Sequence, residues 1–504
     1  MANTNHSLTR RKFLSNIAAG LAVSMLPNIV KNIAAQTRLL KPNIVFIYTD
    51  DQAPWGVGIS GYPYAETPNM DNLARQGAYL KNTFVTTPVC SPARASLITS
   101  RYGTELGIYD FIPHPKHRLF NEEWAQVGLN PNLVTFPELL QKSGYATGLV
   151  GKWHLGDWTK LDTDKFHPKN HGFDYFMGLT RGGIETKDPL LEEDGTVKKF
   201  KGLTVDILTD RACKFLVEHK NHPFLLCLHH RAPHTKWLPV AEEDWAPFEN
   251  LDPTPPDPDY PDLDVERVKR MTREYLASIR GVDRNLGKIL SLLDDLDLTD
   301  NTVVIFTSDH GYNMGHNGIW HKGNGKWVTY HDPPATETIA KGYRPNMYDN
   351  SVRVPAIVRW PGVIKPGTVV TNTTSNLDWY PTICAMAGIE IPENVIIRGR
   401  NILPLLEGEQ IENWDDDFYG EYQMVNYCQS YMRMYRTPEW KLVRDFRNPE
   451  RDELYNLQKD PEENFNLINS NSKVVELISE KLNKKIIEKM KELNDPLLKS
   501  FIVE

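Results

Sequence analysis

The stretch NIVFIYTDDQ, residues 43–52, places a short apolar run directly before polar side chains that include Asp50 and Asp51. A continuous apolar run of this length is typical of a strand that is buried on both faces of a sheet. Three further runs have the same form: YATGLVG (145–151), FLLCLH (224–229) and TVVIFT (302–307). Amphipathic patterns between them predict helices within 67–80, 133–144 and 273–296. The alternation predicts an α/β domain.

The pattern changes beyond about residue 396. The segments 418–422, 431–445 and 452–457 resemble an antiparallel set with tight turns, and 472–493 has the pattern of an amphipathic helix. We therefore predict a catalytic domain over 36–395 and a smaller α+β subdomain over 396–504. Two segments, 251–264 and 326–345, are predicted to be irregular loops, and the second is long enough to be a functional insertion.

The N-terminus has the features of an export signal. Arg10 and Arg11 precede a modest apolar run, which is typical of a twin-arginine signal peptide with a cleavage site after Ala35. A basic N-terminal helix or a membrane anchor is the alternative, but the run 17–29 is too short to span a bilayer comfortably. We expect residues 1–35 to be removed, the twin-arginine translocase to be a partner, and the protein to be periplasmic or secreted without stable membrane insertion.

Composition excludes several classes of function. The chain of 504 residues has a formal net charge of −8, which argues against a general nucleic-acid-binding surface. Its five cysteines form an odd, sparse set without C-x-x-C spacing, so neither a disulfide framework nor a thiolate zinc site is expected.

Each of the four predicted strands stops at side chains that can bind a metal or an anion. In open α/β sheets the ligand site lies beyond the carboxyl ends of the strands, so we expect these groups to converge on one crevice. Three carboxylates and one imidazole would favour Ca²⁺ or Mg²⁺, while the imidazole leaves Mn²⁺ or Zn²⁺ open. Two lysines among Gly, Trp and His residues would add a pocket for a tetrahedral oxyanion. The residues are Asp50, Asp51, Lys152, His154, His234, Asp309, His310 and Lys322.

The heptapeptide PVCSPAR, residues 88–94, sets Cys90 between two prolines. The segment that follows predicts a helix that opens near Ala93, which would place Cys90 close to a positive helix end. From these residues alone, Cys90 could be a buried thiol, a metal ligand or a side chain that is modified before use.

Taken together, these motifs resemble the formylglycine-dependent sulfatases of the alkaline-phosphatase-like superfamily. The matching segments occur in the family's order: NIVFIYTDDQ, the C-x-P-x-R signature in CSPARASLITSRY, GKWHLG, APHT, FTSDHGYNMGHNGIWHKG and MYDNSVRVPAIVRWPG. DELYNLQKDPEENFNL, residues 452–467, resembles the family's C-terminal subdomain. The resemblance implies a large mixed sheet sandwiched by helices, plus a C-terminal α+β subdomain with an antiparallel sheet.

The resemblance also implies roles for single residues. Cys90 would be oxidised by a formylglycine-generating enzyme or an anaerobic maturase to Cα-formylglycine, an aldehyde that hydrates to a gem-diol. The metal, Ca²⁺ with Mg²⁺ or Mn²⁺ as alternatives, would be held by Asp50, Asp51, Asp309 and His310 together with residue 90. Arg94 would orient the diol, Lys152 and Lys322 would bind the sulfate, His234 would protonate the leaving alcohol, and His154 would deprotonate the second hydroxyl.

The function that the resemblance implies is hydrolysis of a sulfate ester on a sulfated oligo- or polysaccharide. Hydrolysis of a phosphonate monoester or phosphodiester, and a non-catalytic secreted carbohydrate-binding protein, are the alternatives. One departure from the family is the insertion 323–346, which separates Lys322 from the YDNS segment and affects the expected pocket shape. Further contacts to a sugar are expected from aromatic and basic residues near the motifs, namely Arg181, His316, Trp320, His321 and Arg433.

Overall fold

The computed structural model describes residues 41–159 and 161–501. The predicted signal peptide, residues 1–35, lies outside the described residues. Within the described part, no helix is both long enough and apolar enough to cross a bilayer. The five cysteines are all unpaired, in agreement with the expectation of no disulfide framework.

Within the described residues, ten strands form one mixed sheet in the order β12-β2-β11-β8-β1-β7-β3-β4-β5-β6. Its centre consists of the four strands that the sequence predicts, and these are neighbours and mutually parallel. They are β8 (Thr302–Ser308), β1 (Asn43–Thr49), β7 (Phe224–His229) and β3 (Ala146–Lys152). Nearly every residue in them is buried, which explains why their sequences are continuous apolar runs.

The flanking strands make the sheet mixed. On one side, β11 (Arg353–Arg359) runs antiparallel to both β8 and β2 (Ala78–Phe84), and β12 (Thr368–Ser375) pairs in parallel with β2. On the other side, β4 (Tyr175–Leu179) is parallel to β3, while β5 (Leu190–Glu193) and β6 (Thr196–Lys199) are antiparallel. The expected large mixed sheet is confirmed.

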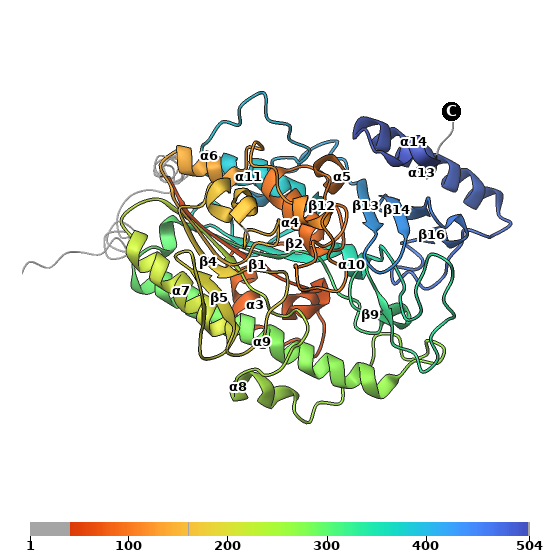
Figure 1. Ribbon diagram of the computed structural model, residues 1–504, viewed down its shortest axis with the longest axis horizontal. Coiled ribbons are helices and arrows are strands. Elements are labelled where there is room, and N and C mark those ends of the chain that lie inside the picture. The colour runs from red at the N-terminus through yellow and green to blue at the C-terminus, as the bar shows by residue number, and fades with distance from the viewer. Residues whose placement is uncertain (1–40, 160, 502–504) are drawn as a thin grey trace, which may run out of the picture. The chain divides into compact units, whose positions relative to one another are not determined.

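Helices cover both faces of this sheet (Figure 1). Alternate residues of β1 supply the two hydrophobic cores, because successive side chains of a strand point to opposite faces. Phe46 packs on the face covered by α4 (Cys90–Thr99), α6 (Phe136–Lys142), α11 (Trp379–Met386) and α12 (Leu403–Leu406). Val45 and Ile47 pack on the face covered by α3 (Pro68–Arg75), α7 (Thr204–His219) and α9 (Val265–Asp295).

Three of the predicted helix boundaries are wrong. The helix predicted within 273–296 is α9, which begins eight residues earlier, at Val265. The segment 67–80 forms α3 only as far as Arg75, and strand β2 begins at Ala78, because Gly77 turns the chain back against the carbonyl of Val358. The helix expected to open near Ala93 begins three residues earlier, at Cys90. Pro92 lies in its first turn, where the missing N–H of proline has no intrahelical partner to lose.

The C-terminal part holds a four-stranded antiparallel sheet in the order β13-β14-β15-β16, as expected. Its strands are β13 (Phe418–Met424), β14 (Ser430–Arg436), β15 (Trp440–Asp445) and β16 (Glu453–Asn456), and α13 (Lys473–Glu492) packs on it through Leu482 and Ile486. These elements gather at the blue end of the chain in Figure 1. Buried ion pairs connect this sheet to α10 (Asp349–Val352), since Arg436 and Lys441 both contact the Asp349 carboxylate.

Candidate active site

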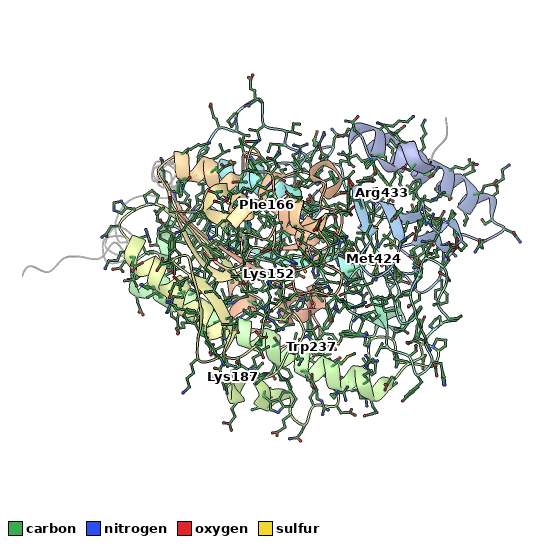
Figure 2. The ribbon with its side chains drawn as sticks, in the orientation of Figure 1. Lys152, Phe166, Lys187, Trp237, Met424 and Arg433 are labelled. Carbon is green, nitrogen blue, oxygen red and sulfur yellow. The ribbon has the colours of Figure 1, made fainter. Side chains whose placement is uncertain are left out.

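The carboxyl ends of the four central strands meet at one site, as the sequence predicts. Asp50 and Asp51 follow β1, Lys152 is the last residue of β3, and Asp309 follows β8. Hydrogen bonds join these strand ends directly: the Asp51 amide N–H donates to Asp309 Oδ1 at 3.1 Å, and Lys152 Nζ donates to Asp50 Oδ2 at 2.6 Å. Figure 2 labels Lys152 near the middle of the sheet.

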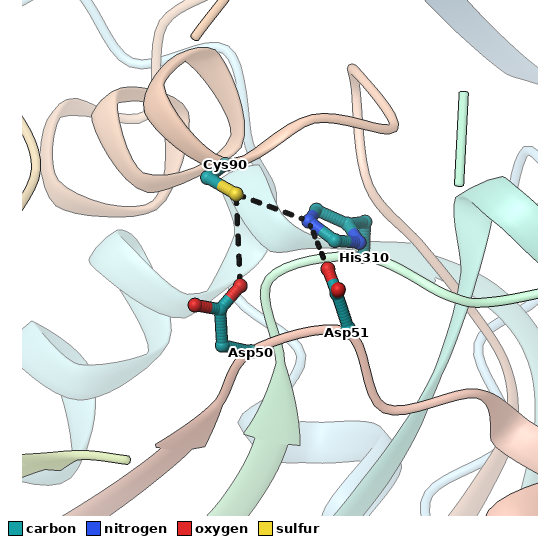
Figure 3. A group of neighbouring side chains, drawn as sticks. All are labelled: Asp50, Asp51, Cys90 and His310. Atoms are coloured by element: carbon teal, nitrogen blue, oxygen red, sulfur yellow. Dashed lines mark hydrogen bonds and ion pairs between the residues drawn. The ribbon is translucent and has the colours of Figure 1, made fainter. Parts of the chain in front are cut away.

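Cys90 enters this site as the first residue of α4, with Val89 as an extended N-cap residue that offers no side-chain cap. Its Sγ atom lies 3.6 Å from Asp50 Oδ1, 3.5 Å from His310 Nε2 and 3.0 Å from Lys322 Nζ. Figure 3 shows the thiol facing the carboxylate and the imidazole from the helix end. The helix N-terminus and the ammonium group both favour negative charge at this position.

Four buried groups at this point are arranged as a metal site. One ligand atom from each of Asp50, Asp51, Cys90 and His310 lies within 4.8 Å of the others. In the part of the chain that the structure describes, Asp51 Oδ2 is buried and has no hydrogen-bond partner. A buried carboxylate oxygen without a donor is costly, and a divalent cation would satisfy it. The set offers two carboxylates, one imidazole and the side chain of residue 90, and its carboxylate oxygens fit Ca²⁺, Mg²⁺ or Mn²⁺.

Asp309 borders this group. Its Oδ1 lies 3.3 Å from His310 Nε2, and its Oδ2 accepts hydrogen bonds from Arg94 Nη2 at 2.8 Å and Nε at 3.1 Å. Arg94 Nη1 donates to the Lys152 carbonyl at 3.0 Å. Among the described residues Arg94 makes no hydrogen bond with Cys90, so its contacts are those of a residue that fixes Asp309 and the end of β3.

The electrostatics of the three carboxylates differ. Burial alone would raise the pKa of Asp50 and of Asp51. The charge of Lys152 nevertheless holds the pKa of Asp50 below its ordinary range, and the charge of Lys322 does the same for Asp51. Burial and the negative charge of Asp50 raise the pKa of Asp309 to about 7. Each carboxylate thus has a cationic partner, Lys152 for Asp50, Lys322 for Asp51 and Arg94 for Asp309. The raised pKa of Asp309 indicates that mutual repulsion among the carboxylates is still large, and a bound cation would reduce it.

Burial favours the neutral form of two histidines on the pocket wall. His154 Nε2 donates to the Ile112 carbonyl at 2.9 Å, which leaves Nδ1 as a buried acceptor without a partner among the described residues. His234 Nδ1 donates to the Thr235 carbonyl at 2.7 Å, and its Nε2 lies 4.0 Å from Asp51 Oδ2. Burial lowers the pKa of His154 well below its ordinary value and that of His234 to about 4.

The backbone around the site is strained. Asp51 and His154 have positive φ values, 69° and 61°, as does His321 at 84°. A non-glycine residue in this region costs of order 1–3 kcal/mol, and such residues concentrate at functional sites. Gly182 closes against the His154 imidazole, where an added Cβ would lie only 2.3 Å from Nε2. The position of His154 therefore depends on a glycine in the facing loop.

These side chains open into a pocket of about 370 Å³. Of the residues predicted from the sequence, Cys90, Lys152, His154, His234 and Lys322 line it, as do Arg181 and His321. Sequence reasoning missed the segment 111–117, together with Asn324 and Tyr427. The first of these had a signal in the sequence, since FIPHPKHR (111–118) concentrates basic residues between prolines.

Three expected sugar contacts are wrong. Arg433, labelled in the C-terminal part of Figure 2, is fully buried, and its Nε donates to Asp495 Oδ2 at 2.6 Å. His316 packs against Trp55 with ring centroids 6.0 Å apart, and Trp320 packs against Trp237 at 6.3 Å. None of the three lines the pocket, because aromatic and basic composition near a motif does not reveal the direction of a side chain.

The insertion 323–346 supports Lys322. The Gly323 amide donates to the Pro88 carbonyl at 3.1 Å, next to Cys90, and Asn346 Nδ2 donates to the Lys322 carbonyl at 2.9 Å. Asn324 Oδ1 accepts from His321 Nδ1 at 2.6 Å and reaches the pocket. The two ends of the insertion thus close on each other behind Lys322 and hold it against Cys90.

Several known proteins are similar to this chain in sequence or in structure. Steryl-sulfatase of Rattus norvegicus is 29% identical over 469 residues, which span 78% of this chain and 74% of that protein. N-acetylglucosamine-6-O-sulfatase of Bacteroides thetaiotaomicron is 27% identical over 510 residues, 85% of this chain and 82% of that protein. A solved structure, described as a complex with its substrate D-glucosamine-2-N,6-O-disulfate, superposes with a TM-score of 0.75 at 25% identity and covers 91% of this chain and 99% of its own.

Family models match both parts of the chain. A model for the C-terminal region of N-sulphoglucosamine sulphohydrolase matches residues 343–492, which include the antiparallel sheet and α13. The sulfatase model matches residues 42–389, from the start of β1 to the end of the main sheet and its helices, and with the buried Cys90 site this shows that the chain belongs to the sulfatase family.

Proposed function

We propose that this protein removes sulfate from a sulfated oligo- or polysaccharide, and that Cys90, oxidised to Cα-formylglycine, carries the nucleophile. Hydrolysis of sulfuric esters follows from membership in the family. The observation that supports the proposal for residue 90 is the position of its Sγ atom, between two carboxylates, an imidazole and an ammonium group. The thiol marks the place that the oxygens of a formylglycine side chain would take.

The carbohydrate substrate is supported by the similar proteins. One is described as acting on N-acetylglucosamine 6-O-sulfate and another is solved with a disulfated glucosamine. The pocket itself suits a polar ligand, since His154, Arg181, His234 and His321 line it.

Asp50, Asp51, Asp309 and His310 would hold the metal together with residue 90, and Ca²⁺ is the ion that we propose, with Mg²⁺ or Mn²⁺ as alternatives. When bound, the ion would supply positive charge that makes an oxygen of residue 90 more acidic and offsets the charge of the sulfate. The unpartnered Asp51 Oδ2 and the raised pKa of Asp309 support this assignment.

Side chains of the protein are proposed to bind the sulfate, to position Asp309 and to accept a proton. Lys152 and Lys322 present ammonium groups at the pocket floor, where they bind sulfate oxygens and neutralise charge that would repel a nucleophile. Arg94 keeps Asp309 and the end of β3 in place. His154 Nδ1, neutral and free of partners among the described residues, accepts a proton within the pocket.

His234 is proposed as the general acid for the leaving alcohol. Because its Nδ1 proton is held by the Thr235 carbonyl, it can donate only from Nε2, and only after it has gained a second proton. Burial disfavours that proton, whereas the neighbouring Asp51 and Asp50 favour it, and a bound sulfate would favour it further.

Maturation and export complete the proposal. A formylglycine-generating enzyme or an anaerobic maturase would supply the oxidant that converts the Cys90 thiol carbon to an aldehyde with loss of sulfur. The signal over 1–35 would direct the folded protein through the twin-arginine translocase to the periplasm or beyond, and the mature chain would divide into residues 36–395 and 396–504.

The test compares 4-nitrophenyl sulfate with the phosphonate monoester 4-nitrophenyl phenylphosphonate, using protein co-expressed with a maturase. We expect the sulfate to be hydrolysed with the higher kcat/KM, and desulfation of glycosaminoglycan or algal oligosaccharides to be detectable by mass. A faster reaction with the phosphonate would make the protein a phosphorus hydrolase. Equal inactivity of the wild type and the Cys90→Ala variant on every ester would overturn the proposal.

A further inference from the structure

An aromatic strip leads from the pocket to the insertion. The rings of Phe111 and Tyr427 lie 5.5 Å apart, and Tyr427 stacks on Tyr343 at 5.0 Å with an interplanar angle of 19°. His117 meets both Phe111 and Tyr427 edge-on. Phe111, His117 and Tyr427 line the pocket, Tyr343 belongs to the insertion 323–346, and all four side chains are half-buried.

Two cations accompany this strip. The Arg118 guanidinium lies 5.6 Å from the centre of the Tyr427 ring, and Lys326 Nζ lies 5.4 Å from the centre of the Tyr343 ring. In the part of the chain that the structure describes, neither side chain forms an ion pair with a carboxylate. Burial, and the positive charges of Arg267 and Arg118, lower the pKa of Lys326. The strip therefore carries positive charge that the protein does not neutralise.

This positive charge contrasts with the protein as a whole, which is acidic, with a formal net charge of −8. Positive charge beside a pocket attracts anionic ligands and gives no such attraction to neutral ones.

The aromatic strip is held rigidly from below. The buried Asp110 carboxylate accepts hydrogen bonds from the amides of Phe111 at 2.8 Å and of Val425 and Asn426 at 3.0 Å each. Asn426 Nδ2 in turn donates to the Phe111 carbonyl at 2.8 Å. These hydrogen bonds fix the segment after α5 (Gly103–Leu106) against the loop after β13. Phe111 and Tyr427 therefore form one preorganised surface.

We propose that this strip (Phe111, His117, Arg118, Lys326, Tyr343 and Tyr427) is a subsite for the sugar next to the one that loses its sulfate, and that this neighbouring sugar is itself anionic. The aromatic rings would contact the apolar face of the sugar, and Arg118 and Lys326 would bind a sulfate or a carboxylate on it. This inference rests on the proposed function of the Cys90 pocket. It makes the substrate a polyanionic chain rather than a free monosaccharide sulfate, and it gives the insertion a binding role.

The test removes the two charges in an Arg118→Gln/Lys326→Gln variant. Its control is Lys214→Gln/Lys484→Gln, which removes two exposed charges from α7 and α13 and makes the same change in net charge. Substrates are 4-nitrophenyl sulfate and size-defined glycosaminoglycan and carrageenan oligosaccharides, in which the neighbouring sugar carries a carboxylate, a sulfate or no charge. For chains with an anionic neighbour, we expect KM to rise about tenfold in the test variant with kcat unchanged.

The same variant should leave 4-nitrophenyl sulfate and chains with a neutral neighbour unaffected, and its loss on anionic chains should shrink at high salt. Comparison of the KM changes for chains with a carboxylate and for chains with a sulfate on the neighbouring sugar identifies which anion is bound. Equal KM changes for charged and neutral neighbours, or equal changes in the control variant, would overturn the subsite. The subsite would also be overturned if the test variant hydrolysed 4-nitrophenyl sulfate normally and its KM changed for none of the oligosaccharides. That result would leave the proposed function intact.

A binding measurement tests the subsite independently of the proposed function, because it does not require turnover. In a Cys90→Ala background, calorimetric titration with the preferred oligosaccharide should give a dissociation constant that weakens about tenfold on Arg118→Gln/Lys326→Gln and on Tyr427→Leu. Such weakening would support the subsite independently of turnover, and if the wild type co-expressed with a maturase hydrolysed no ester, the subsite would stand while the proposed function would be rejected. Binding that ignores both changes would reject the subsite, provided that circular dichroism shows the variants to be folded.

Discussion

Lys322 Nζ lies 3.0 Å from the Sγ atom of Cys90, although 231 residues separate the two in the sequence. The same ammonium group contacts Asp51 Oδ1 at 2.6 Å, and only 3% of its side chain is exposed. A buried positive charge at this distance from the reacting position stabilises negative charge that develops there.

Lys322→Gln should therefore lower kcat on 4-nitrophenyl sulfate by about 10²–10³-fold, because removal of one preorganised electrostatic group usually has an effect of this size. The control is Lys341→Gln, an exposed lysine within the same insertion, which should retain full activity. If Lys322→Gln kept more than a tenth of the wild-type kcat while folding normally, Lys322 would have no role in the reaction.

Mass spectrometry of the tryptic peptide that contains residue 90 should show an aldehyde in place of the thiol in active protein. Co-expression with a maturase should raise the aldehyde fraction and the specific activity in parallel. Cys90→Ala should abolish turnover and leave the melting temperature nearly unchanged, because the lost Sγ lies at the pocket rather than in a hydrophobic core. An active preparation that contains only intact cysteine would contradict the modification.

Removal of the metal should reduce both activity and stability. A ligand that binds only the folded protein stabilises it by about 4 kcal/mol at a thousand times its dissociation constant, so chelation should lower the melting temperature and Ca²⁺ should restore it. Asp51→Asn should lose bound metal, measured by elemental analysis, and should no longer respond to added Ca²⁺. Replacement of Ca²⁺ by Mg²⁺ or Mn²⁺ in the same assay identifies the ion. Full activity after exhaustive chelation would exclude a metal role.

The role of His234 can be tested with two leaving groups. If His234 protonates the departing alcohol, His234→Ala should impair a sugar sulfate about 10²–10⁴-fold more than 4-nitrophenyl sulfate, whose leaving anion needs little protonation. Equal losses on both substrates, accompanied by a lower melting temperature, would instead mean that His234 only packs behind the strand.

Asp110 should make stability depend on pH. Burial raises its pKa to about 6 in the folded protein, whereas the ordinary value in an unfolded chain is about 3.9. Between these two values the folded protein binds a proton that the unfolded chain has released, so stability from this group rises as pH falls through 6 and levels off near 4. The free energy of unfolding of the wild type, relative to Asp110→Asn, should increase by up to about 3 kcal/mol over this range. Denaturant titrations of the wild type and the Asp110→Asn variant at several pH values measure it.

The centre of the fold was predictable because it is encoded locally. Buried parallel strands are continuous apolar runs, so β1, β3, β7 and β8 were found within a residue or two of their observed bounds. The edge strands were not, because their sequences are short or mixed. TVKK in β6 is fully exposed. AYLKNTF in β2 follows α3 so closely that the sequence pattern predicts a continuation of the helix.

The site, like the fold, was predictable only where local sequence determines the position of a side chain. The residues at strand ends could be placed together because the topology of a parallel sheet brings those ends to one edge. Phe111 and Tyr427 could not, since their contact depends on Asp110 joining two loops that are 315 residues apart. A sequence pattern reports which way a strand or helix face points, but not which irregular segments will share a buried carboxylate.

Cys90 is only 3% exposed, and every residue of its helix α4 is buried. No second enzyme can bring its own catalytic groups to a carbon at that depth without first undoing the packing of α4 on the sheet. Any conversion of this side chain must therefore take place while the segment is still extended, during or shortly after synthesis. If residue 90 is converted as proposed, the yield of active protein depends on the rate of conversion relative to the rate of folding, and a variant that folds more slowly should give a larger converted fraction.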